Sequence, residues 1–426
     1  MKKRPAALLL AICMLIALLP AAAAEGNIAV AERAGSVEQY YFTSVSGLNS
    51  FLERNRGWTI TVDMLSDWGN ERLCIPEETT VTLNMHGHIY NRGLSESTRN
   101  GEVIWIGSDA KLTINGYTSA NERNTEHTVG VYHSWRREGT ADQNEIFCGG
   151  VIAGGYSTNG GGGIDVKANV TLTLNHVTIA GCRAEQSAGT DGYGGGIWVH
   201  GGVNEGGTVI MNYSTITGCY AYNSGGGLYQ SNHDKFYMEM NQSHIDRNYC
   251  YSDGGGIYLG GATITIKGDN GSYISGNRTG AGGGENGGGV YVYNDGVTLS
   301  RLIITNNRAY DGGGVYCDDK KITLSECTLS DNYATHRGGG VYIGYDNTTI
   351  SSCSITGNGA QYEGSGVYVE SGVDEGFNIT GNTHIAGNTA DNLYFENNVR
   401  ANFTLTNGAN VRLRYKDMPD TYRMVT

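Results

Sequence analysis

Proline and long apolar stretches are both scarce in this 426-residue sequence. It has four prolines against 66 glycines, and no long apolar run follows the first 24 residues. The glycines show no Gly-X-Y period, which excludes a collagen triple helix, and they stand beside aliphatic residues, which excludes a flexible linker. Helical periodicity is missing between the short apolar segments, so βαβ folds are excluded as well. What remains is an all-β fold of short strands and tight turns.

Positive charge is also scarce, with 29 Lys and Arg against 42 Asp and Glu. Residues 1–24 have the features of a secretory signal peptide: Lys2, Lys3 and Arg4, then an apolar run, then small residues ending near Ala24. Its removal takes away three positive charges and changes the net charge from −13 to −16. We therefore expect a secreted or cell-surface bacterial protein, with no transmembrane segment after cleavage and no nucleic acid as partner.

The dominant positive feature is a returning phrase of three glycines followed by an aliphatic, an aromatic and a further residue. The triplets at Gly287, Gly312, Gly338 and Gly364 recur every 25 or 26 residues, with Ser365 replacing the middle glycine of the last. A fixed period of this length is the signature of stacked supersecondary units. The phrase reads GGGIDV at Gly161, GGGIWV at Gly194, GGGLYQ at Gly225, GGGIYL at Gly254, GGGVYV at Gly287, GGGVYC at Gly312, GGGVYI at Gly338 and GSGVYV at Gly364.

Each repeat carries three short segments of alternating apolar residues, as in 290–292, 297–299 and 302–307. Three strands per repeat predict a three-sided β-solenoid, a right-handed parallel β-helix, whose coils stack at roughly 4.8 Å. We expect about eleven or twelve coils, hence a rod of roughly 55 Å. The predicted organisation is a signal peptide at 1–24, an N-terminal cap at 25–57, irregular coils at 58–160, regular coils at 161–398 and C-terminal edge strands at 399–426.

The ends of a solenoid are open sheet edges that need protection. Residues 46–54 predict a short amphipathic capping helix with Ser46 as its N-cap. At the other end, residues 411–415 alternate apolar residues with arginine, which protects an edge by charge. Residues 121–147 interrupt the period, and we expect them to form a loop that protrudes from one coil.

A second phrase, an aliphatic residue three positions before asparagine, predicts a ladder inside the solenoid. Stacked amides satisfy one another and the turn backbone, so the interpretation is structural. The ladder comprises Cys182, Cys219, Asn248, Asn277, Asn307, Asn332, Asn358 and Asn388.

The two phrases together resemble the repeat of chlamydial polymorphic outer membrane proteins, which pairs Gly-Gly-Ala-aliphatic with Phe-x-x-Asn. Here the second phrase has Ile or Leu instead of Phe, as in Ile245-Asp246-Arg247-Asn248. The resemblance covers roughly residues 160–395. It implies a bacterial right-handed β-helix surface protein engaged in adhesion or display, although no outer-membrane β-barrel sequence follows.

An aromatic residue stands two places after each triplet in most repeats, and alternation places it on the outer face. We expect a surface strip that a glycan or a protein could contact, or a self-stacking ladder that stabilises the sheet. The candidate binding column is Trp198, Tyr229, Tyr258, Tyr291, Tyr316, Tyr342, Tyr368 and Tyr394.

Because many β-helix proteins cleave polysaccharides, the acidic residues require inspection. Asp253 and Asp311 precede triplets, but the same position holds other residue types elsewhere, and the adjacent Asp318 and Asp319 indicate a solvated turn. We assign no catalytic, cofactor-binding or metal-binding residue. His86 and His88 share a strand face, but two histidines without a third ligand do not predict a zinc site.

Eight of the nine cysteines remain after the signal peptide. Cys327 and Cys353 lie 26 residues apart at equivalent positions, so they predict a stacked pair, either disulfide-bonded or free.

The function favoured by these features is a non-catalytic adhesin or display rod that binds a polysaccharide or a surface protein. Two alternatives stay open: a polysaccharide lyase or glycoside hydrolase of the β-helix class, and a purely structural spacer.

Overall fold

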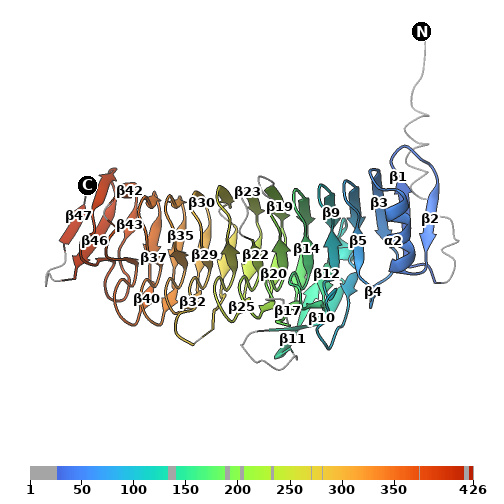
Figure 1. The fold of residues 1–426 in the computed structure, drawn as a ribbon, viewed down its shortest axis with the longest axis horizontal. Helices are drawn as coiled ribbons and strands as arrows, with labels where there is room; N and C mark the ends of the chain where they lie inside the picture. Colours follow the sequence, from blue (N-terminus) through green and yellow to red (C-terminus); the bar gives the residue numbers. More distant parts are fainter. Residues whose placement is uncertain are drawn as a thin grey trace, which may run out of the picture.

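The chain forms a long parallel β-solenoid, seen side-on in Figure 1. The computed structural model describes residues 26–132, 141–187, 192–201, 206–231, 235–269, 271–280, 282–373, 375–416 and 422–425. It confirms the predicted fold class, with about eleven coils and a helix at the N-terminal end. The proposed signal peptide, residues 1–24, lies outside the described residues.

Three series of parallel strands form the faces of the solenoid. The first, sheet 1, begins with two antiparallel strands, β2 and β1, and continues in parallel from β3. Its strands are β1 (Ala29–Arg33), β2 (Gln39–Phe42), β3 (Thr59–Met64), β6 (Thr80–Asn84), β9 (Lys111–Asn115), β15 (Thr171–Asn175), β19 (Gly206–Asn212), β23 (Lys235–Asn241), β27 (Ile264–Lys267), β30 (Val297–Ser300), β34 (Thr323–Ser325), β38 (Thr349–Ser351), β42 (Phe377–Gly381) and β45 (Ala401–Leu405).

Sheet 2 contains the strands that follow the glycine triplets, together with β5 and β8 before them and β44 after them. They are β5 (Leu73–Ile75), β8 (Ile104–Ile106), β14 (Ile164–Val166), β18 (Ile197–Val199), β22 (Leu228–Gln230), β26 (Ile257–Leu259), β29 (Val290–Val292), β33 (Val315–Cys317), β37 (Val341–Ile343), β41 (Val367–Val369) and β44 (Leu393–Phe395).

Sheet 3 precedes the asparagine ladder, and β46 pairs with the last strands of both sheets 2 and 3. Its strands are β4 (Trp68–Gly69), β7 (Ile89–Asn91), β12 (Gly150–Ala153), β16 (Val177–Ala180), β20 (Thr215–Thr217), β24 (His244–Asp246), β28 (Tyr273–Ser275), β31 (Ile303–Thr305), β35 (Thr328–Ser330), β39 (Ser354–Thr356), β43 (His384–Ile385) and β46 (Asn410–Tyr415), with β47 (Tyr422–Val425) antiparallel to β46.

A fourth series of two-residue strands, which the sequence did not reveal, lies between the asparagine ladder and the glycine triplets. We call it the short-strand ladder. It comprises β13 (Tyr156–Ser157), β17 (Arg183–Ala184), β21 (Tyr220–Ala221) and β25 (Tyr249–Cys250), and then β32 (Arg308–Ala309), β36 (Tyr333–Ala334) and β40 (Gly359–Ala360), with isolated bridges through Arg278 between them.

The short-strand ladder explains why three glycines are needed together. In the coil at 312–314, Gly312 has a φ of +63°, which favours glycine. A Cβ on Gly313 would lie 2.6 Å from the carbonyl carbon and oxygen of Tyr333, and one on Gly314 would lie 2.5 Å from the carbonyl oxygen of Gly340. One glycine is therefore required by conformation and two by close backbone packing.

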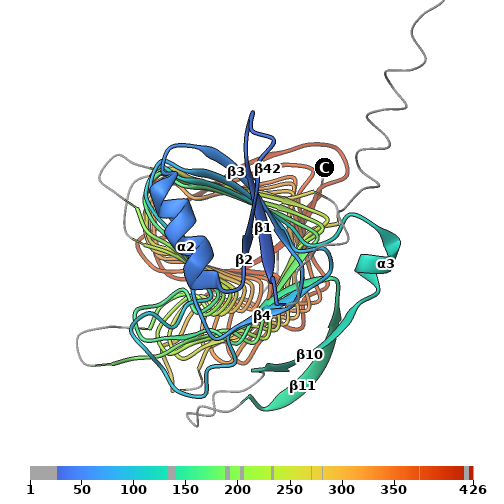
Figure 2. The same cartoon turned by 90° about the vertical axis from the view of Figure 1, so that its right-hand side faces the viewer.

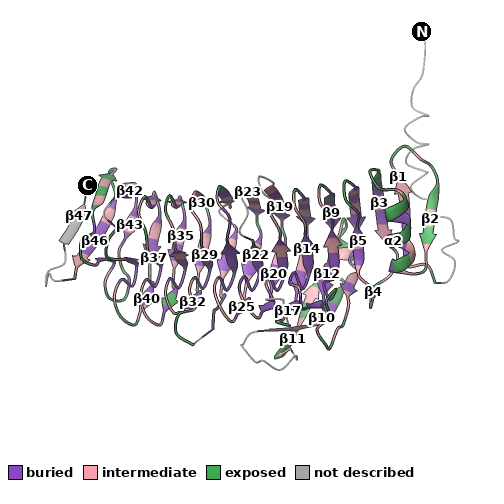
Figure 3. Ribbon diagram, in the orientation of Figure 1, coloured by how far each residue is buried: buried purple, intermediate pink, exposed green. Residues whose placement is uncertain are grey.

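The interior of the solenoid is apolar along its whole length, as the buried residues in Figure 3 show. A single cluster of aliphatic and aromatic side chains extends from Ala29 to Leu413. Alternation in the short strands places every second side chain in this cluster, which is why strands of three residues are sufficient.

The N-terminal end is covered by α2 (Val45–Arg54), which lies across the first coils in Figure 2. Val45, Leu48 and Leu52 are buried against the core. The helix begins before the predicted Ser46: the N-cap is Ser44, whose side chain accepts from the Gly47 amide.

The segment predicted as a protruding loop contains regular structure. It holds α3 (Ala120–Arg123) and an antiparallel hairpin of β10 (Glu126–Val131) and β11 (Gln143–Cys148), outside the tube in Figure 2. Val129 and Val131 pack against buried residues of β12 and β16. Trp135, Arg136 and Arg137, which fall within this segment, lie outside the described residues.

Candidate functional site

The aromatic column proposed as a binding strip forms a continuous stack on the outside of sheet 2. From Tyr229 to Tyr394, successive rings lie 4.6–5.7 Å apart and nearly parallel. Most rings are covered: Tyr229 is 6% exposed, Tyr258 9%, and Tyr368 is fully buried. Trp198 and Tyr316 are half-buried. The expectation of an open aromatic strip is therefore wrong for most of the column.

The burial of the tyrosines follows from the glycine turns beside them. A Cβ on Gly312 would come within 2.9 Å of the Cα and Cβ atoms of Tyr316, so the base of the tyrosine side chain packs against the turn of its own coil. Burial raises the pKa of Tyr258, Tyr316 and Tyr342 far above the usual range. These hydroxyls stay protonated, and the geometry is that of a packing column.

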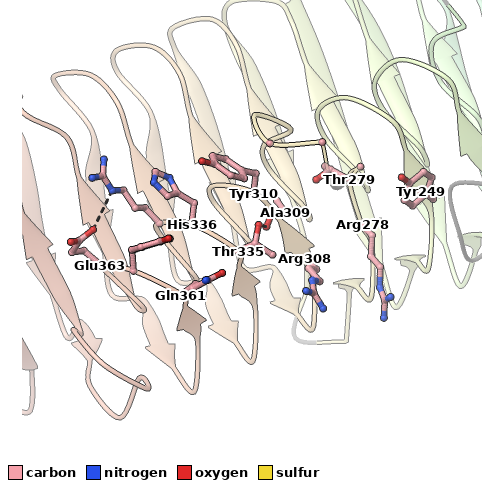
Figure 4. A pocket seen from close by; sticks show the side chains of 15 residues that line it. Tyr249, Arg278, Thr279, Arg308, Ala309, Tyr310, Thr335, His336, Gln361 and Glu363 are labelled. Carbon is pink, nitrogen blue, oxygen red and sulfur yellow. Dashed lines mark hydrogen bonds and ion pairs between the residues drawn. The ribbon is translucent and has the colours of Figure 1, made fainter.

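A groove of about 950 Å³ lies on the other side of the glycine triplets, along the short-strand ladder. Figure 4 shows residues that line it, contributed by several successive coils. Aromatic, cationic and acidic side chains are all present: the lining includes Arg278, Arg308, Tyr310, His336, Tyr362 and Glu363.

His336 lines the groove and contacts Asp311 of the adjacent coil, which lies behind the lining residues. His336 Nδ1 lies 3.0 Å from Asp311 Oδ1, and the Arg337 amide donates to the same oxygen at 2.7 Å. Burial raises the pKa of Asp311 above its usual range. The His336 ring stacks on Tyr310 at 4.7 Å and meets Tyr362 edge-on at 5.3 Å. With Nδ1–H donating to the carboxylate, Nε2 keeps a lone pair and can accept a proton.

Two arginines of the short-strand ladder supply positive charge. Arg278 and Arg308 pair in register, and both are exposed. The Arg308 guanidinium lies 5.1 Å above the ring of Tyr333. Within the described ranges, neither arginine forms an ion pair, whereas Arg337 is held by Glu363 and Glu396. Arg278 and Arg308 are therefore available to an anionic ligand.

The other acidic residues considered from the sequence are hydrogen-bonded. Asp253, which like Asp311 precedes a triplet, accepts from the Asn286 amide at 2.8 Å, and burial raises its pKa to about 6. Asp318 accepts from the Tyr291 hydroxyl at 2.6 Å, and burial raises its pKa. Asp318 is thus part of the tyrosine column rather than a freely solvated turn.

The asparagine ladder has its predicted members in register. Each amide Nδ2 from Asn248 to Asn358 donates to the Oδ1 of the next asparagine at 2.9–3.1 Å. Each also donates to a carbonyl of the preceding coil, as Asn307 does to Ile274 at 2.9 Å. The ladder continues beyond Asn388 to Asn392, which the sequence pattern missed. Cys182 and Cys219 occupy its first two positions, and both are buried free thiols.

A second asparagine ladder, on the outer edge of sheet 1, was not predicted. Its side-chain amides bond coil to coil at 2.7–2.9 Å, and Asp63 accepts at its front end. The members are Asn84, Asn115, Asn175, Asn212 and Asn241. The asparagine that ends each of the strands β6, β9, β15, β19 and β23 was the available signal.

The stacked cysteines Cys327 and Cys353 are both buried free thiols. Their mutual hydrogen bond lowers the pKa of Cys327 and raises that of Cys353. His86 bonds Asp63 at 2.8 Å, and His88 bonds Asp67 at 3.0 Å. Among the residues that the structure describes, no three His, Cys, Asp or Glu side chains are grouped as metal ligands.

Comparison with known proteins gives little beyond the fold. No family model matches the sequence, and no curated protein matches it. The resemblance to chlamydial polymorphic outer membrane proteins therefore stays a prediction. Among solved structures, the chain is similar to a periplasmic alginate epimerase, AlgG, with 12% identity and a TM-score of 0.38 over 84% of this chain and 75% of that chain. A likeness at this level carries no argument about activity. No helix in the described part of the chain is long and apolar enough to cross a membrane.

The prediction of a non-catalytic adhesin or display rod is wrong. The contact surface expected for it was the aromatic column, and that column is largely buried. The groove along the short-strand ladder includes instead His336, which contacts the Asp311 carboxylate.

Proposed function

We propose that this protein is an enzyme that cleaves an acidic polysaccharide by β-elimination. The reaction would take place in the groove along the short-strand ladder, which we call the short-strand groove. The observation that carries the proposal is the contact of the groove residue His336 with the Asp311 carboxylate at 3.0 Å, together with the exposed Arg278 and Arg308 elsewhere in the same lining. The groove crosses several coils that stack roughly 4.8 Å apart, so it suits an extended polymer better than a compact metabolite.

The arginines define the substrate class. A guanidinium presents parallel N–H donors that match a carboxylate, and such pairs are bidentate and specific. Two arginines on adjacent coils would hold two acidic groups, or one acidic group and its neighbour along the chain. Tyr310 and Tyr362 add ring faces on which sugar rings can pack.

The reaction needs a base, charge neutralisation and a proton for the leaving group. His336 Nε2 would take the proton from the carbon next to the sugar carboxylate, while Arg308 neutralises the charge that develops on that carboxylate. Elimination then forms a carbon–carbon double bond as the glycosidic C–O bond breaks. The Tyr310 hydroxyl would give its proton to the leaving oxygen and be reprotonated by solvent. Asp311 would hold the imidazole in the required tautomer.

The test is product release by the purified protein on a panel of acidic polysaccharides, followed by the absorbance of unsaturated sugars together with new reducing ends. We expect His336→Gln to lower turnover by about 10²–10⁴-fold. Arg308→Gln should lower kcat as well as raise KM, because Arg308 both binds the carboxylate and neutralises the charge that develops on it. His384→Gln, on β43 of sheet 3, is the matched control and should leave turnover unchanged.

Three results would contradict the proposal. These are release of reducing ends without unsaturated products, which indicates a hydrolase; full activity in His336→Gln; and no turnover on any acidic polymer. Absence of both turnover and binding would favour the structural spacer.

We also propose export, with cleavage near Ala24, because the first residues have the charged, apolar and small-residue segments of a signal peptide. N-terminal sequencing of protein recovered from the periplasm, medium or cell surface tests this. A mature chain that retains Met1 would contradict it.

A further inference from the structure

One coil interrupts the aromatic column with a charge. The outward position of sheet 2 holds Trp105 in β8 and Trp198 in β18, but Asp165 in β14 between them. Asp165 is 5% exposed. The position falls in the GGGIDV phrase, where an aromatic residue would have continued the stack.

Asp165 is the centre of a three-residue cluster. Its Oδ1 lies 2.8 Å from His200 Nε2, and its Oδ2 lies 2.9 Å from Lys167 Nζ. Lys167 Nζ and His200 Nε2 are 3.1 Å apart. The imidazole packs on the indole of Trp198, with ring centroids 3.7 Å apart. Hydrogen bonds and charges from His200 and Lys167 hold the pKa of Asp165 below its usual range, although burial opposes this.

The arrangement of protons directs the cluster outward. With His200 in the Nε2–H tautomer, both His200 and Lys167 donate to the Asp165 carboxylate, and the 3.1 Å contact between Lys167 Nζ and His200 Nε2 then joins two donors and is no hydrogen bond. His200 Nδ1 and the remaining N–H of Lys167 are then left for other partners. The side chains of Lys167 and His200 are 30% and 24% exposed, against 7% for Asp165. A ligand approaching this face therefore meets the two nitrogen-bearing groups first.

The cluster of Asp165, Lys167 and His200 is not expected to add to the stability of the fold. A buried carboxylate carries a desolvation penalty even when it is paired, and replacing a buried ion pair with apolar side chains is often neutral or stabilising. An aromatic side chain at position 165 would stand in register between the indoles of Trp105 and Trp198. The charged cluster thus favours recognition over packing.

We propose that Lys167 and His200, held by Asp165 beside Trp105, form a second contact site for anionic sugar residues, separate from the short-strand groove. The site takes a carboxylated or sulfated sugar, with the anionic group on the two nitrogens and the sugar ring against the neighbouring indole of Trp105. The identity of the ligand rests on the proposed function, because the second site would hold another part of the same polymer. Two contacts on one rod raise the affinity for long chains without strengthening either contact.

The test uses calorimetry with a galacturonate tetramer in the His336→Gln background, which keeps the ligand intact. We expect two tetramers per protein, falling to one when Lys167→Met is added and to one when Arg308→Gln is added instead. With long polygalacturonate, Lys167→Met should weaken binding about tenfold or more. Sulfated dextran and neutral dextran are parallel probes that separate carboxylate, sulfate and ring recognition.

The matched control is Lys111→Met, an exposed lysine on β9 of sheet 1, which should change neither stoichiometry nor affinity. Asp165→Tyr is a second variant: it restores the aromatic column, should keep the melting temperature, and should abolish the second site. A stoichiometry unchanged by both Lys167→Met and Asp165→Tyr overturns the inference.

The two proposals fail separately. Turnover with a single tetramer site that Arg308→Gln abolishes would retain the proposed function and overturn the second site. Lys167-dependent binding without turnover on any polymer would do the reverse. Equal binding of neutral dextran would overturn the anionic specificity of the cluster.

Discussion

The two sides of the glycine triplets differ in how strictly they repeat. After the triplets, the aromatic position is tyrosine in every coil from Tyr229 to Tyr394, and the rings stack and are mostly covered. Before the triplets, the residue changes from coil to coil, through Asp253, Asn286, Asp311 and Arg337. The groove lies on the varied side. In this protein, positions that repeat strictly are packing positions, whereas the proposed site uses positions that vary from coil to coil.

The physical reason is that a ladder stabilises only when each coil presents the same group to the next. An asparagine needs an asparagine above and below it, and a stacked ring needs another ring. Recognition of a polymer needs different groups side by side, so the residues that bind must depart from the repeat. Asp165 is such a departure within the tyrosine column itself.

We expect the largest loss of stability when a glycine of a triplet is substituted. In Gly313→Ala the new Cβ would lie 2.6 Å from the Tyr333 carbonyl, between two backbones that cannot separate without displacing the short-strand ladder. We expect a loss of about 3 kcal/mol or more in the free energy of unfolding, measured by chemical denaturation. Gly282→Ala, where the nearest atoms belong to the flexible Glu285 carboxylate, is the control. Equal stability of the two variants would refute the packing explanation.

A slightly smaller loss is expected from the asparagine ladder. Asn307→Ala removes an amide that donates to Ile274 and Asn332 and accepts from Asn277, so several buried groups lose their partners. The expected cost is about 3 kcal/mol in denaturation experiments. Asn402→Ala, an exposed residue with one lateral amide bond at 3.1 Å, should cost below about 0.5 kcal/mol. A similar cost at both positions would show that the interior ladder has no special role.

We expect the free energy of unfolding to depend on pH through Asp253, one of the residues that precede the triplets. Burial raises the pKa of Asp253 to about 6 in the folded protein, against about 3.9 in the unfolded chain. The folded state therefore holds this proton more tightly, so its contribution to stability is present below about pH 4 and is lost as the pH rises through 6. Asp253→Asn should remove this dependence. The difference in unfolding free energy between wild type and variant should then change by about 2 kcal/mol between pH 4 and 7. Parallel curves for the two proteins would contradict this assignment.

The smallest effect is expected in the tyrosine column. Tyr342→Phe keeps the stacked ring and removes a hydroxyl that bonds Glu370, so we expect a loss of about 1 kcal/mol or less. Turnover and polysaccharide binding should not change, because the ring is covered. If Tyr342→Phe markedly weakened polysaccharide binding with an unchanged melting temperature, the tyrosine column would have to contact the polysaccharide directly.

Much of the fold could be predicted from the sequence because ladders repeat. The triplets, the three strand segments and the Ile-x-x-Asn phrase gave the solenoid and the interior asparagine ladder. The helix start was missed by two residues because Ser44 and Ser46 both suit an N-cap, and only the Ser44 side chain reaches the Gly47 amide. The short-strand ladder was missed because two-residue strands such as β32 leave too little pattern to detect.

The candidate site was less accessible to sequence reasoning. Asp311 drew attention as a residue before a triplet, but His336 lies 25 residues later, and nothing in the pattern joins them. Asp165 stood in a quoted phrase, yet its partners Lys167 and His200 come from two coils. Departures from the repeat at these positions were the signal that could have been used.

The sequence by itself determined the period, the strand segments and the stacking of like residues, because those features are local and recur in every coil. Only the tertiary structure decided which outward side chains are covered. The tyrosines that follow the triplets are mostly covered, whereas the short-strand ladder before the triplets borders a groove that includes His336 and the exposed Arg278 and Arg308. Exposure depends on how neighbouring coils fill the space around a side chain, and alternation along a strand does not specify that.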